Sequence, residues 1–204
     1  MNIKKEHWET VYADKLLTEV SWYEKKPETS LNIIADLNLP KNAAIIDIGG
    51  GDSLLADHLL ALGYTDIAVL DISDKAIERA KIRLGDSAQQ IEWILSDILE
   101  FKPPKAYDVW HDRAAFHFLT GEQDQRTYLK NVDLSLKADA IMVLSTFAED
   151  GPERCSGLAV RQHSEKSLNK LFGEYLEKLQ CFHIDHRTPF QTIQKFIYCS
   201  FRRR

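Results

Sequence analysis

Short apolar runs alternate along the chain with segments whose apolar residues recur at helical spacing. Residues 43–48 read AAIIDI, a run that is typical of a buried strand. Residues 53–62 follow with leucines at helical spacing, and Gly63 ends this predicted helix. The alternation continues and predicts strands at 66–73, 90–98, 106–111 and 140–147, with helices at 73–85, 123–136 and 164–179.

The end of the chain departs from this alternation. Two predicted strands, at 180–188 and 194–202, are joined by a turn near Pro189 and Phe190. Alternating strands and helices predict a parallel sheet covered on both faces, and the closing strand pair adds an antiparallel strand. We therefore expect an α/β fold of Rossmann-like type, with a seven-stranded, mostly parallel sheet, an antiparallel last strand and helices on both faces.

Composition and charge narrow the class of protein. The 204 residues are 44% hydrophobic and 28% charged, which predicts one domain with a packed core. The net charge of −5 argues against a nucleic-acid surface, and the basic residues 202–204 are expected to be a solvated end. No apolar stretch has the length of a membrane span, and the N-terminus lacks the apolar core of a signal peptide.

The cysteines indicate whether the protein works in a reducing or an oxidising compartment. Cys155, Cys181 and Cys199 have no metal-binding spacing, and they fit a reducing cytoplasm in which thiols stay free. We expect a cytoplasmic protein, a monomer or weak dimer, without a nucleic-acid or membrane partner.

Three consecutive glycines follow the first predicted strand, in the segment IIDIGGGDS at 45–53. They lie where a parallel sheet binds ligands, beyond the carboxyl end of a strand. Glycine permits backbone angles closed to other residues and lets a ligand approach the main chain. A dinucleotide site needs G-x-G-x-x-G, and this pattern fails because Leu54 stands in the place of the third glycine.

With Asp47 two residues before the first glycine, the turn resembles motif I of class I S-adenosylmethionine-dependent methyltransferases, D-x-G-x-G-x-G. Ser53 replaces the last glycine and can cap the following helix. The resemblance covers residues 1–150 well, while the C-terminal strands match only in pattern. It implies S-adenosylmethionine as the cofactor, and it assigns to the cofactor site the turn residues Asp47, Gly49, Gly50, Gly51 and Ser53.

Acids at the ends of the next strands extend the resemblance. Asp71 ends the second strand, where a carboxylate can accept hydrogen bonds from both ribose hydroxyls, and Ile72 is assigned to the same site. In the resembled family an acid at the position of Asp97 contacts the adenine amino group, and the next residue, Ile98, packs on the ring. The alternative roles are a helix N-terminal acid for Asp71 and a turn acid for Asp97.

The N-terminal segment is rich in aromatic residues, namely Trp8, Tyr12, Trp22 and Tyr23. It resembles the entry segment of a methyltransferase-like branch that includes protein-lysine methyltransferases of elongation factor and citrate synthase. In that branch a W-x-x-x-Y pair, here Trp8 and Tyr12, reaches over the methionine end of the cofactor, where aromatic faces stabilise the sulfonium. We assign Trp22 to the same site. The alternative is an amphipathic helix whose aromatics belong only to the core.

The predicted chemistry is methyl transfer by in-line displacement, in which the protein chiefly positions donor and acceptor. The remaining help is proton removal by a base within hydrogen-bond reach of the acceptor. The resembled branch carries an acid–base pair after the fourth strand, where Asp112 and Arg113 stand. We assign Arg113 to the cofactor, Asp112 as the first candidate base and His117 as the second, while His111 could steer the acceptor.

We therefore predict an S-adenosylmethionine-dependent methyltransferase whose acceptor is a protein lysine or a small molecule bearing N, O or S. A non-catalytic module that binds the cofactor is the alternative, and a dehydrogenase is a further one. Within the single domain, residues 1–30 cover the cofactor, 31–150 bind it, and 151–204 supply a substrate loop and the C-terminal strands. The loop at residues 147–164 could shape the substrate site, with Cys155 and Arg161 lining it. The alternative is that this loop is only a solvated connection.

Overall fold

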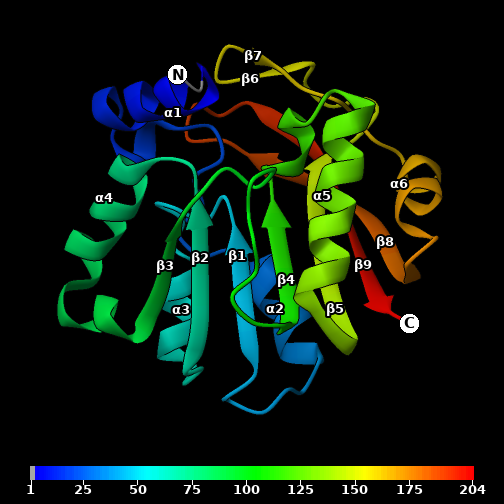
Figure 1. Ribbon diagram of the computed structural model, residues 1–204. Helices are drawn as coiled ribbons and strands as arrows, with labels where there is room; N and C mark the ends of the chain where they lie inside the picture. The colour runs from blue at the N-terminus through cyan, green and yellow to red at the C-terminus, as the bar shows by residue number, and fades with distance from the viewer. Residues whose placement is uncertain (1–2) are drawn as a thin grey trace.

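A seven-stranded sheet runs through the centre of the protein, with helices on both of its faces (Figure 1). The computed structural model describes residues 3–204, and the strands lie in the order β3-β2-β1-β4-β5-β9-β8. Their bounds are β1 (Ala44–Ile48), β2 (Asp66–Asp71), β3 (Ile91–Leu95), β4 (Tyr107–Arg113), β5 (Leu136–Phe147), β8 (Leu176–Arg187) and β9 (Ile193–Arg203). β1 to β5 are mutually parallel, and β9 is antiparallel to both of its neighbours, so the predicted fold class is confirmed.

Helices follow β1, β2, β4 and β5 as the sequence pattern predicts, and further helices precede β1. The α-helices are α1 (Ile3–Asp14), α2 (Glu28–Asp36), α3 (Leu55–Ala61), α4 (Asp74–Leu84), α5 (Glu122–Ser135) and α6 (Glu165–Phe172). Within residues 3–204, short 3₁₀ segments accompany them: η1 (Leu17–Glu19), η2 (Gly85–Gln90) and η3 (Phe116–Phe118). Among the helices of residues 3–204, none combines the length and the apolar character needed to cross a bilayer.

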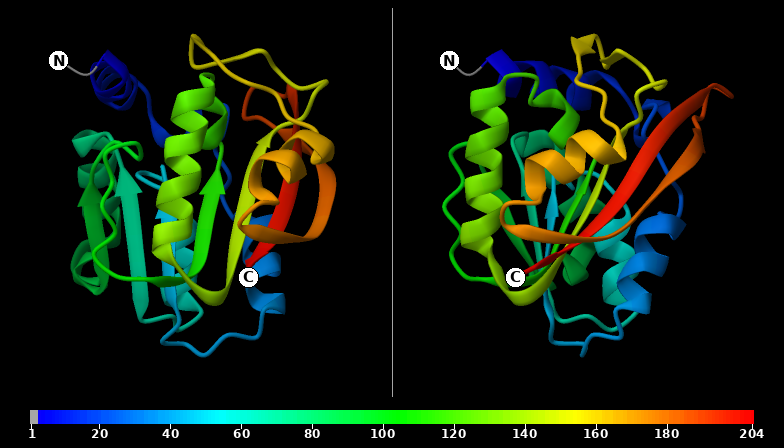
Figure 2. Two further views of the ribbon diagram at one scale, coloured as in Figure 1. Left: turned by 45° about the vertical axis from the view of Figure 1, so that its right-hand side comes forward. Right: turned by 90° about the vertical axis from the view of Figure 1, so that its right-hand side faces the viewer.

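Two apolar layers flank the sheet, because successive strand residues point to opposite faces. In β1, Ile46 and Ile48 join the layer that α5 and α6 cover, whereas Ile45 joins the layer that α2 and α3 cover. Figure 2 shows α5 and α6 on one side of the sheet and α2 on the other. Both faces are therefore closed to solvent, which leaves the carboxyl ends of the strands as the open edge.

α4 begins and ends where the sequence predicts. Ser73 is the N-cap residue, and its hydroxyl accepts a hydrogen bond from the Ala76 N–H at 3.2 Å. Gly85 is the C-cap residue with a φ of +55°, a backbone region that favours glycine. The start of α4 directly after β2 fixes the position of Asp71 at the edge of the sheet.

The helix predicted at 164–179 is too long. α6 ends at Phe172, and β8 begins at Leu176, which pairs with Arg203 of β9 and is 1% exposed. At the helix end, a Cβ on Gly173 would lie 2.5 Å from the carbonyl oxygen of Asn169, so glycine is required there. Pairing with β9 therefore decides the structure of residues 176–179, although their apolar spacing also fits a helix.

The expectation that all three thiols are free is wrong. Cys181 of β8 and Cys199 of β9 stand opposite each other in the strand register and are joined by a disulfide. Cys155 is free and buried, and it belongs to a small strand pair, β6 (Arg154–Cys155) and β7 (Leu158–Ala159), within the loop that follows β5. The spacing of the cysteines could not reveal this bond, because the register of two strands creates it.

Candidate functional site

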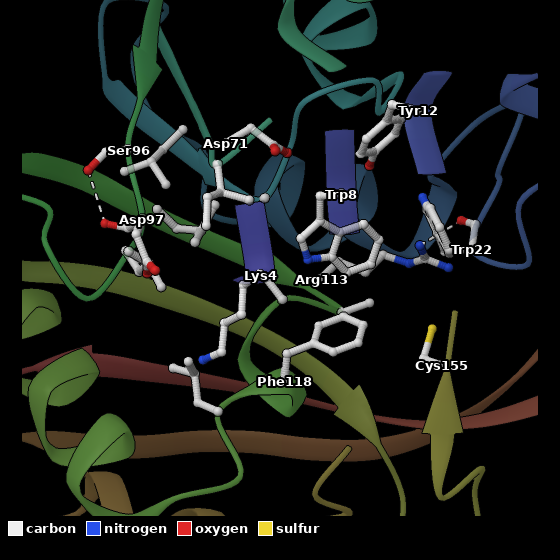
Figure 3. Close-up of a pocket in the computed structure, with 18 residues that line it drawn as sticks. Lys4, Trp8, Tyr12, Trp22, Asp71, Ser96, Asp97, Arg113, Phe118 and Cys155 are labelled. Carbon is white, nitrogen blue, oxygen red and sulfur yellow. Dashed lines mark hydrogen bonds between the residues drawn. The ribbon is translucent and has the colours of Figure 1, made fainter. Parts of the chain in front are cut away.

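A pocket opens at the carboxyl ends of the parallel strands, beneath α1 (Figure 3). It contains about 820 Å³ of empty space, including the solvent at its mouth, within the usual range for ligand sites. Most of the predicted cofactor residues line this main pocket, namely Trp8, Tyr12, Trp22, Gly49, Asp71, Ile72, Asp97, Ile98 and Arg113. Figure 3 shows Asp71 and Asp97 at one end, and Tyr12 and Trp22 at the other.

A second pocket adjoins the first and shares Tyr12, Trp22, Gly49 and Arg113 with it. The predicted residues Asp47, Gly50 and Ser53 line it, together with His111. The Ser53 hydroxyl accepts a hydrogen bond from the Leu55 N–H at 3.1 Å, at the start of α3. The glycine turn therefore separates the two pockets and contributes to both.

Asp71 lies at the strand end where the ribose is expected. Its side chain is 4% exposed, and Oδ1 accepts a hydrogen bond from the Ser73 N–H at 2.8 Å. Burial raises the pKa of Asp71 to about 7, against the opposing effect of backbone N–H groups such as that of Gly51. The group therefore changes charge near neutral pH.

Cofactor affinity should increase as the pH rises through about 7. Ribose hydroxyls donate to a carboxylate better than to a carboxylic acid, and Asp71 becomes fully ionised only above its raised pKa. We expect S-adenosylhomocysteine to bind several-fold more tightly at pH 8 than at pH 6, measured by calorimetry. Asp71→Asn should bind roughly 1–3 kcal/mol more weakly and lose the pH dependence. Unchanged affinity in a folded Asp71→Asn protein would limit Asp71 to capping α4.

The glycine turn is shaped by close contacts with the neighbouring strand ends. The N–H of Gly49 donates to the Leu70 carbonyl at 2.7 Å, and its φ is +65°. Gly51 lines neither pocket; a Cβ there would lie 2.5 Å from Asp71 Oδ2 and 2.6 Å from the Cβ of Ala76. The turn therefore needs glycine at position 51 to keep the Asp71 carboxylate at the edge of the pocket.

A buried polar chain lies under the turn. His111 Nδ1 is 2.7 Å from Asp47 Oδ1, and His111 Nε2 is 2.8 Å from the hydroxyl of Ser30, which the sequence analysis did not identify. Asp47 Oδ2 is buried without a hydrogen-bond partner among the described residues. Both nitrogens of His111 are used within the protein, which argues against a role in steering the acceptor. Ser30 is fully buried, so this Ser-His-Asp chain offers no accessible nucleophile.

Aromatic side chains form the other end of the main pocket. The Trp8 ring lies 5.1 Å from Phe118, 5.8 Å from Trp22 and 6.2 Å from Tyr12, measured between centroids. Phe118 also lines the pocket, and its only sequence signal was an aromatic residue soon after the fourth strand. Cys155 lines this end as expected, whereas Arg161 lies outside both pockets. The cluster offers ring faces to a cation.

Arg113 fixes part of this aromatic end. It donates to the Trp22 carbonyl at 2.9 Å and to the Tyr198 hydroxyl at 3.1 Å, and it pairs with Glu24 at 3.2 Å. A guanidinium with five donors suits such a site, in which several acceptors surround it. Arg113 therefore holds Trp22 against Trp8 and leaves its own side chain between the two pockets.

The two candidate bases lie outside both pockets. Asp112 is fully buried; Oδ1 accepts from the N–H groups of Ala115 and Phe116 at 3.0 and 3.1 Å, and Oδ2 accepts from the Tyr128 hydroxyl at 2.6 Å. Adjacent strand residues point to opposite faces, so Asp112 faces α5 while Arg113 faces the pockets. His117 is also fully buried, its ring stacks on Phe147 at 4.4 Å, and burial lowers its pKa to about 3.

The hydrogen-bond acceptors at the glycine turn fit S-adenosylmethionine. The unpartnered Asp47 Oδ2 provides an acceptor for an ammonium group, and the Asp71 carboxylate provides one for vicinal hydroxyls. The turn between them is held free of side chains by its glycines. An amino acid at one end and a nucleoside at the other match these two acceptors.

Comparisons with known proteins agree with this arrangement. Residues 46–142 match the family model described as a methyltransferase domain. The chain is 29% identical over 107 residues to malonyl-[acyl-carrier protein] O-methyltransferase 2 of Ilyobacter polytropus, which covers 52% of this chain and 40% of that protein. It is 26% identical over 145 residues to EEF1A lysine methyltransferase 2 of Danio rerio, which covers 66% of this chain and 62% of that protein. The chain thus spans less than two thirds of these curated relatives.

Solved structures share the fold across nearly the whole chain. A SAM-dependent methyltransferase from Anabaena variabilis superposes with a TM-score of 0.76 and 15% identity, covering 100% of this chain and 96% of that one. The N-methyltransferase NodS from Bradyrhizobium japonicum, in complex with S-adenosyl-L-homocysteine, gives 0.67 and 17% identity, with coverage of 96% and 97%. At these identities the similarity concerns the fold alone.

Proposed function

Because residues 46–142 match a methyltransferase domain, we propose that the chain is a class I S-adenosylmethionine-dependent methyltransferase and that it transfers the methyl group of this cofactor to an acceptor in the main pocket. The observation that carries the proposal is the pair of buried acceptors, Asp47 Oδ2 and the Asp71 carboxylate, on either side of the glycine turn. When bound, the cofactor would supply a methyl group already activated on a positively charged sulfur.

Different residues around the two pockets would bind different parts of the cofactor. Asp71 and Ile72 would hold the ribose, and Asp97 with Ile98 would hold the adenine at the neighbouring strand end. The amino-acid part would be held by the residues of the turn that line the second pocket, namely Asp47, Gly49, Gly50 and Ser53. Each assignment follows the donors and acceptors that the cofactor carries.

The aromatic end would stabilise the sulfonium and exclude water from it. Trp8, Tyr12 and Trp22 present ring faces there, and a desolvated cation on such faces gains about 2 kcal/mol. The buried contacts of Asp112 and His117 support a structural role for both side chains, which is to hold the turn after β4 in place. No general base is needed if the acceptor is already nucleophilic. Positioning is then the main contribution of the protein.

The acceptor end of the main pocket favours a small molecule that is neutral. Among the described lining residues, the carboxylates are Asp71 and Asp97, both at the nucleoside end, and the cations Lys4 and Arg113 are paired with Asp124 and Glu24, so no lining carboxylate at the aromatic end would hold a cationic acceptor. A protonated amine beside a sulfonium would be repelled there. The second candidate is a protein lysine, which the names of relatives such as EEF1A lysine methyltransferase 2 favour.

The protein should bind S-adenosylmethionine and S-adenosylhomocysteine but not NAD. The turn lacks the third glycine of a dinucleotide site, with Leu54 at that position. Calorimetry with the three compounds on the same preparation tests this expectation. Binding of NAD without binding of S-adenosylhomocysteine would contradict the proposed function.

The acceptor is found by incubating cell extract with methyl-labelled S-adenosylmethionine, with and without the protein, and separating proteins from metabolites. Label in the metabolite fraction supports a small acceptor, and label on a protein lysine supports the second candidate. Cofactor binding without transfer to either fraction would indicate a non-catalytic binding module.

We further propose that the protein acts in the cytoplasm as a monomer or weak dimer, without a nucleic-acid or membrane partner. The net charge of −5 supports the absence of a nucleic-acid face. The disulfide between Cys181 and Cys199 instead favours an oxidising location. Thiol labelling in intact cells, followed by cell fractionation, decides between these locations. Light scattering of the purified protein measures the oligomeric state.

A further inference from the structure

α1 carries a carboxylate that caps a distant helix. The Glu9 side chain accepts hydrogen bonds from the Ser73 hydroxyl at 3.0 Å and from the N–H groups of Asp74 and Lys75 at 2.8 and 3.1 Å. N–H groups in the first turn of a helix lack partners within that helix, and the helix dipole favours a negative charge there. Burial alone would raise the pKa of Glu9, but these hydrogen bonds lower it below its usual value. Glu9 therefore attaches α1 to the start of α4.

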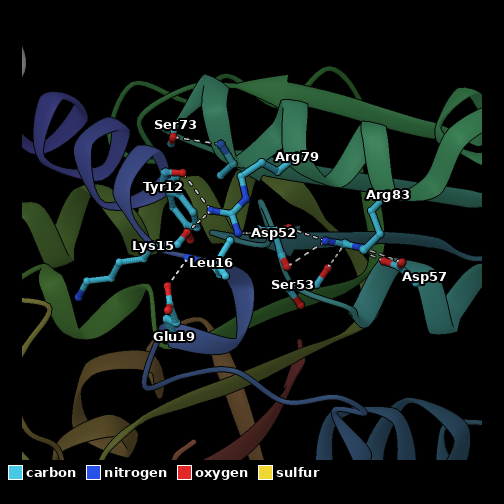
Figure 4. A network of polar contacts seen from close by, with 11 residues as sticks. Tyr12, Lys15, Leu16, Glu19, Asp52, Ser53, Asp57, Ser73, Arg79 and Arg83 are labelled. Carbon is cyan, nitrogen blue, oxygen red and sulfur yellow. Dashed lines mark hydrogen bonds and ion pairs between the residues drawn. The ribbon is translucent and has the colours of Figure 1, made fainter.

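Arg79 of α4 makes the reciprocal attachment at the other end of α1 (Figure 4). Its Nη1 donates at 2.9 Å to the carbonyl of Tyr12 in the last turn of α1, where carbonyls lack helical partners, and at 2.6 Å to the carbonyl of Lys15, directly after the helix. Its guanidinium also lies 5.8 Å from the centroid of the Tyr12 ring. Glu9 thus accepts three hydrogen bonds from the start of α4, and Arg79 of α4 donates two to the end of α1 and the residue after it.

Arg79 also reaches the glycine turn. Its Nη2 is 2.8 Å from Oδ2 of Asp52, the residue directly after the three glycines, and Arg83 pairs with the other carboxylate oxygen of Asp52. Asp52 is 4% exposed, so the pair is shielded from water on the carboxylate side. One guanidinium therefore connects α1 to the turn that would hold the cofactor.

Besides its polar contacts, α1 is held by the rings of Trp8 and Tyr12, which are half-buried and contact Trp22. Of the α1 side chains described, at positions 4–14, only Val11 is buried. The ion pair from Lys4 to Asp124 of α5, at 3.6 Å, is about 40% exposed on both sides, and exposed pairs of this kind contribute little. We therefore expect the contacts of Glu9 and Arg79 to contribute to how firmly α1 covers the pocket.

We propose that Glu9 and Arg79 are positioning residues that fasten α1 to α4 and so hold Trp8 and Tyr12 over the cofactor. The inference rests on the proposed function, since it requires S-adenosylmethionine in the main pocket. Trp8 precedes Glu9 in the chain, and the Tyr12 carbonyl is itself bound by Arg79, so both aromatic positions depend on the two contacts. Because Lys4, Trp8 and Tyr12 of α1 line this pocket, we expect the release rate of the cofactor to report how firmly α1 is fastened.

The test compares Glu9→Ala with Glu6→Ala, a matched change at an exposed position of the same helix. S-adenosylhomocysteine release is followed by stopped-flow tryptophan fluorescence, because Trp8 and Trp22 line the pocket. Loss of a charged acceptor with three donors should speed release about tenfold in Glu9→Ala. Amide exchange at residues 3–14 of the bound protein should also become faster, and Glu6→Ala should behave as wild type.

The cofactor-free melting temperature separates positioning from general stability. It should change little in Glu9→Ala, because water can replace the exposed hydrogen bonds and Ser73 still caps α4. Arg79→Lys, which keeps the charge but not the fork of donors, should release the cofactor faster than wild type as well. If Glu9→Ala fails to fold, Glu9→Gln replaces it with the same expected direction and a smaller effect.

Wild-type release rates in these variants would overturn the inference, even if exchange in α1 became faster. A lower cofactor-free melting temperature with an unchanged release rate would do the same, since it would mean that the contacts serve only the fold. Failure of the wild-type protein to bind S-adenosylhomocysteine would instead contradict the proposed function, so the two failures are distinguishable.

Discussion

Adding one methyl group at position 51 should remove detectable cofactor binding while the protein stays folded. In Gly51→Ala the new Cβ would lie 2.5 Å from Asp71 Oδ2, so the carboxylate proposed to hold the ribose must move. The backbone angle is not the obstacle, because the positive φ values of the turn belong to Gly49 and not to Gly51. We expect affinity for S-adenosylhomocysteine to fall at least about 100-fold by calorimetry, which corresponds to roughly 2.7 kcal/mol.

Gly121→Ala provides the matched control for this prediction. A Cβ at position 121 would have Asp124 as its nearest neighbour, at 3.9 Å, which is ordinary contact, and the position lies outside both pockets. We expect wild-type affinity and a wild-type circular dichroism spectrum for this variant. If Gly51→Ala also binds normally with a native spectrum, the glycines serve the turn alone and the assignment of Asp71 to the ribose loses its support.

Trp8→Ala should lose turnover far more than it loses stability. Trp8 contacts Tyr12, Trp22 and Phe118 around the pocket, but it is not among the buried residues of the core. Removing it takes away one face for the sulfonium and opens the pocket to water. We expect the rate of S-adenosylhomocysteine formation to fall roughly 30-fold, equivalent to about 2 kcal/mol, with a small change in the cofactor-free melting temperature.

Comparing Trp8→Phe with Trp8→Ala tests whether turnover depends on an aromatic ring at position 8 or on the full size of the tryptophan side chain. A phenyl ring keeps a face for the cation, so this variant should recover much of the turnover that Trp8→Ala loses. The opposite pattern, a large drop in melting temperature with little change in turnover, would identify the cluster of Trp8, Trp22 and Phe118 as ordinary packing. The role of α1 as a cover for the cofactor would then be withdrawn.

The sequence predicted the order of the elements, the antiparallel last strand and the acids at the strand ends. These features are local: a run such as 43–48 has its own periodicity, and Asp47 and the three glycines lie within five consecutive residues. Asp71 and Asp97 could be assigned because each directly follows or ends a predicted strand, and parallel strands present their carboxyl ends at one edge. The structure brings both to the main pocket with Trp8, Tyr12, Trp22 and Arg113.

Only the tertiary structure decided which groups meet across long stretches of chain. Glu9 caps a helix 65 residues away, and His111 joins Asp47 across 64 positions and Ser30 across 81. The bond between Cys181 and Cys199 depends on the register of two strands, and the direction of Asp112 depends on which face of β4 it occupies. Periodicity and motifs describe neighbours in the chain, whereas these contacts depend on how the packed elements are placed in space, so no local pattern could reveal them.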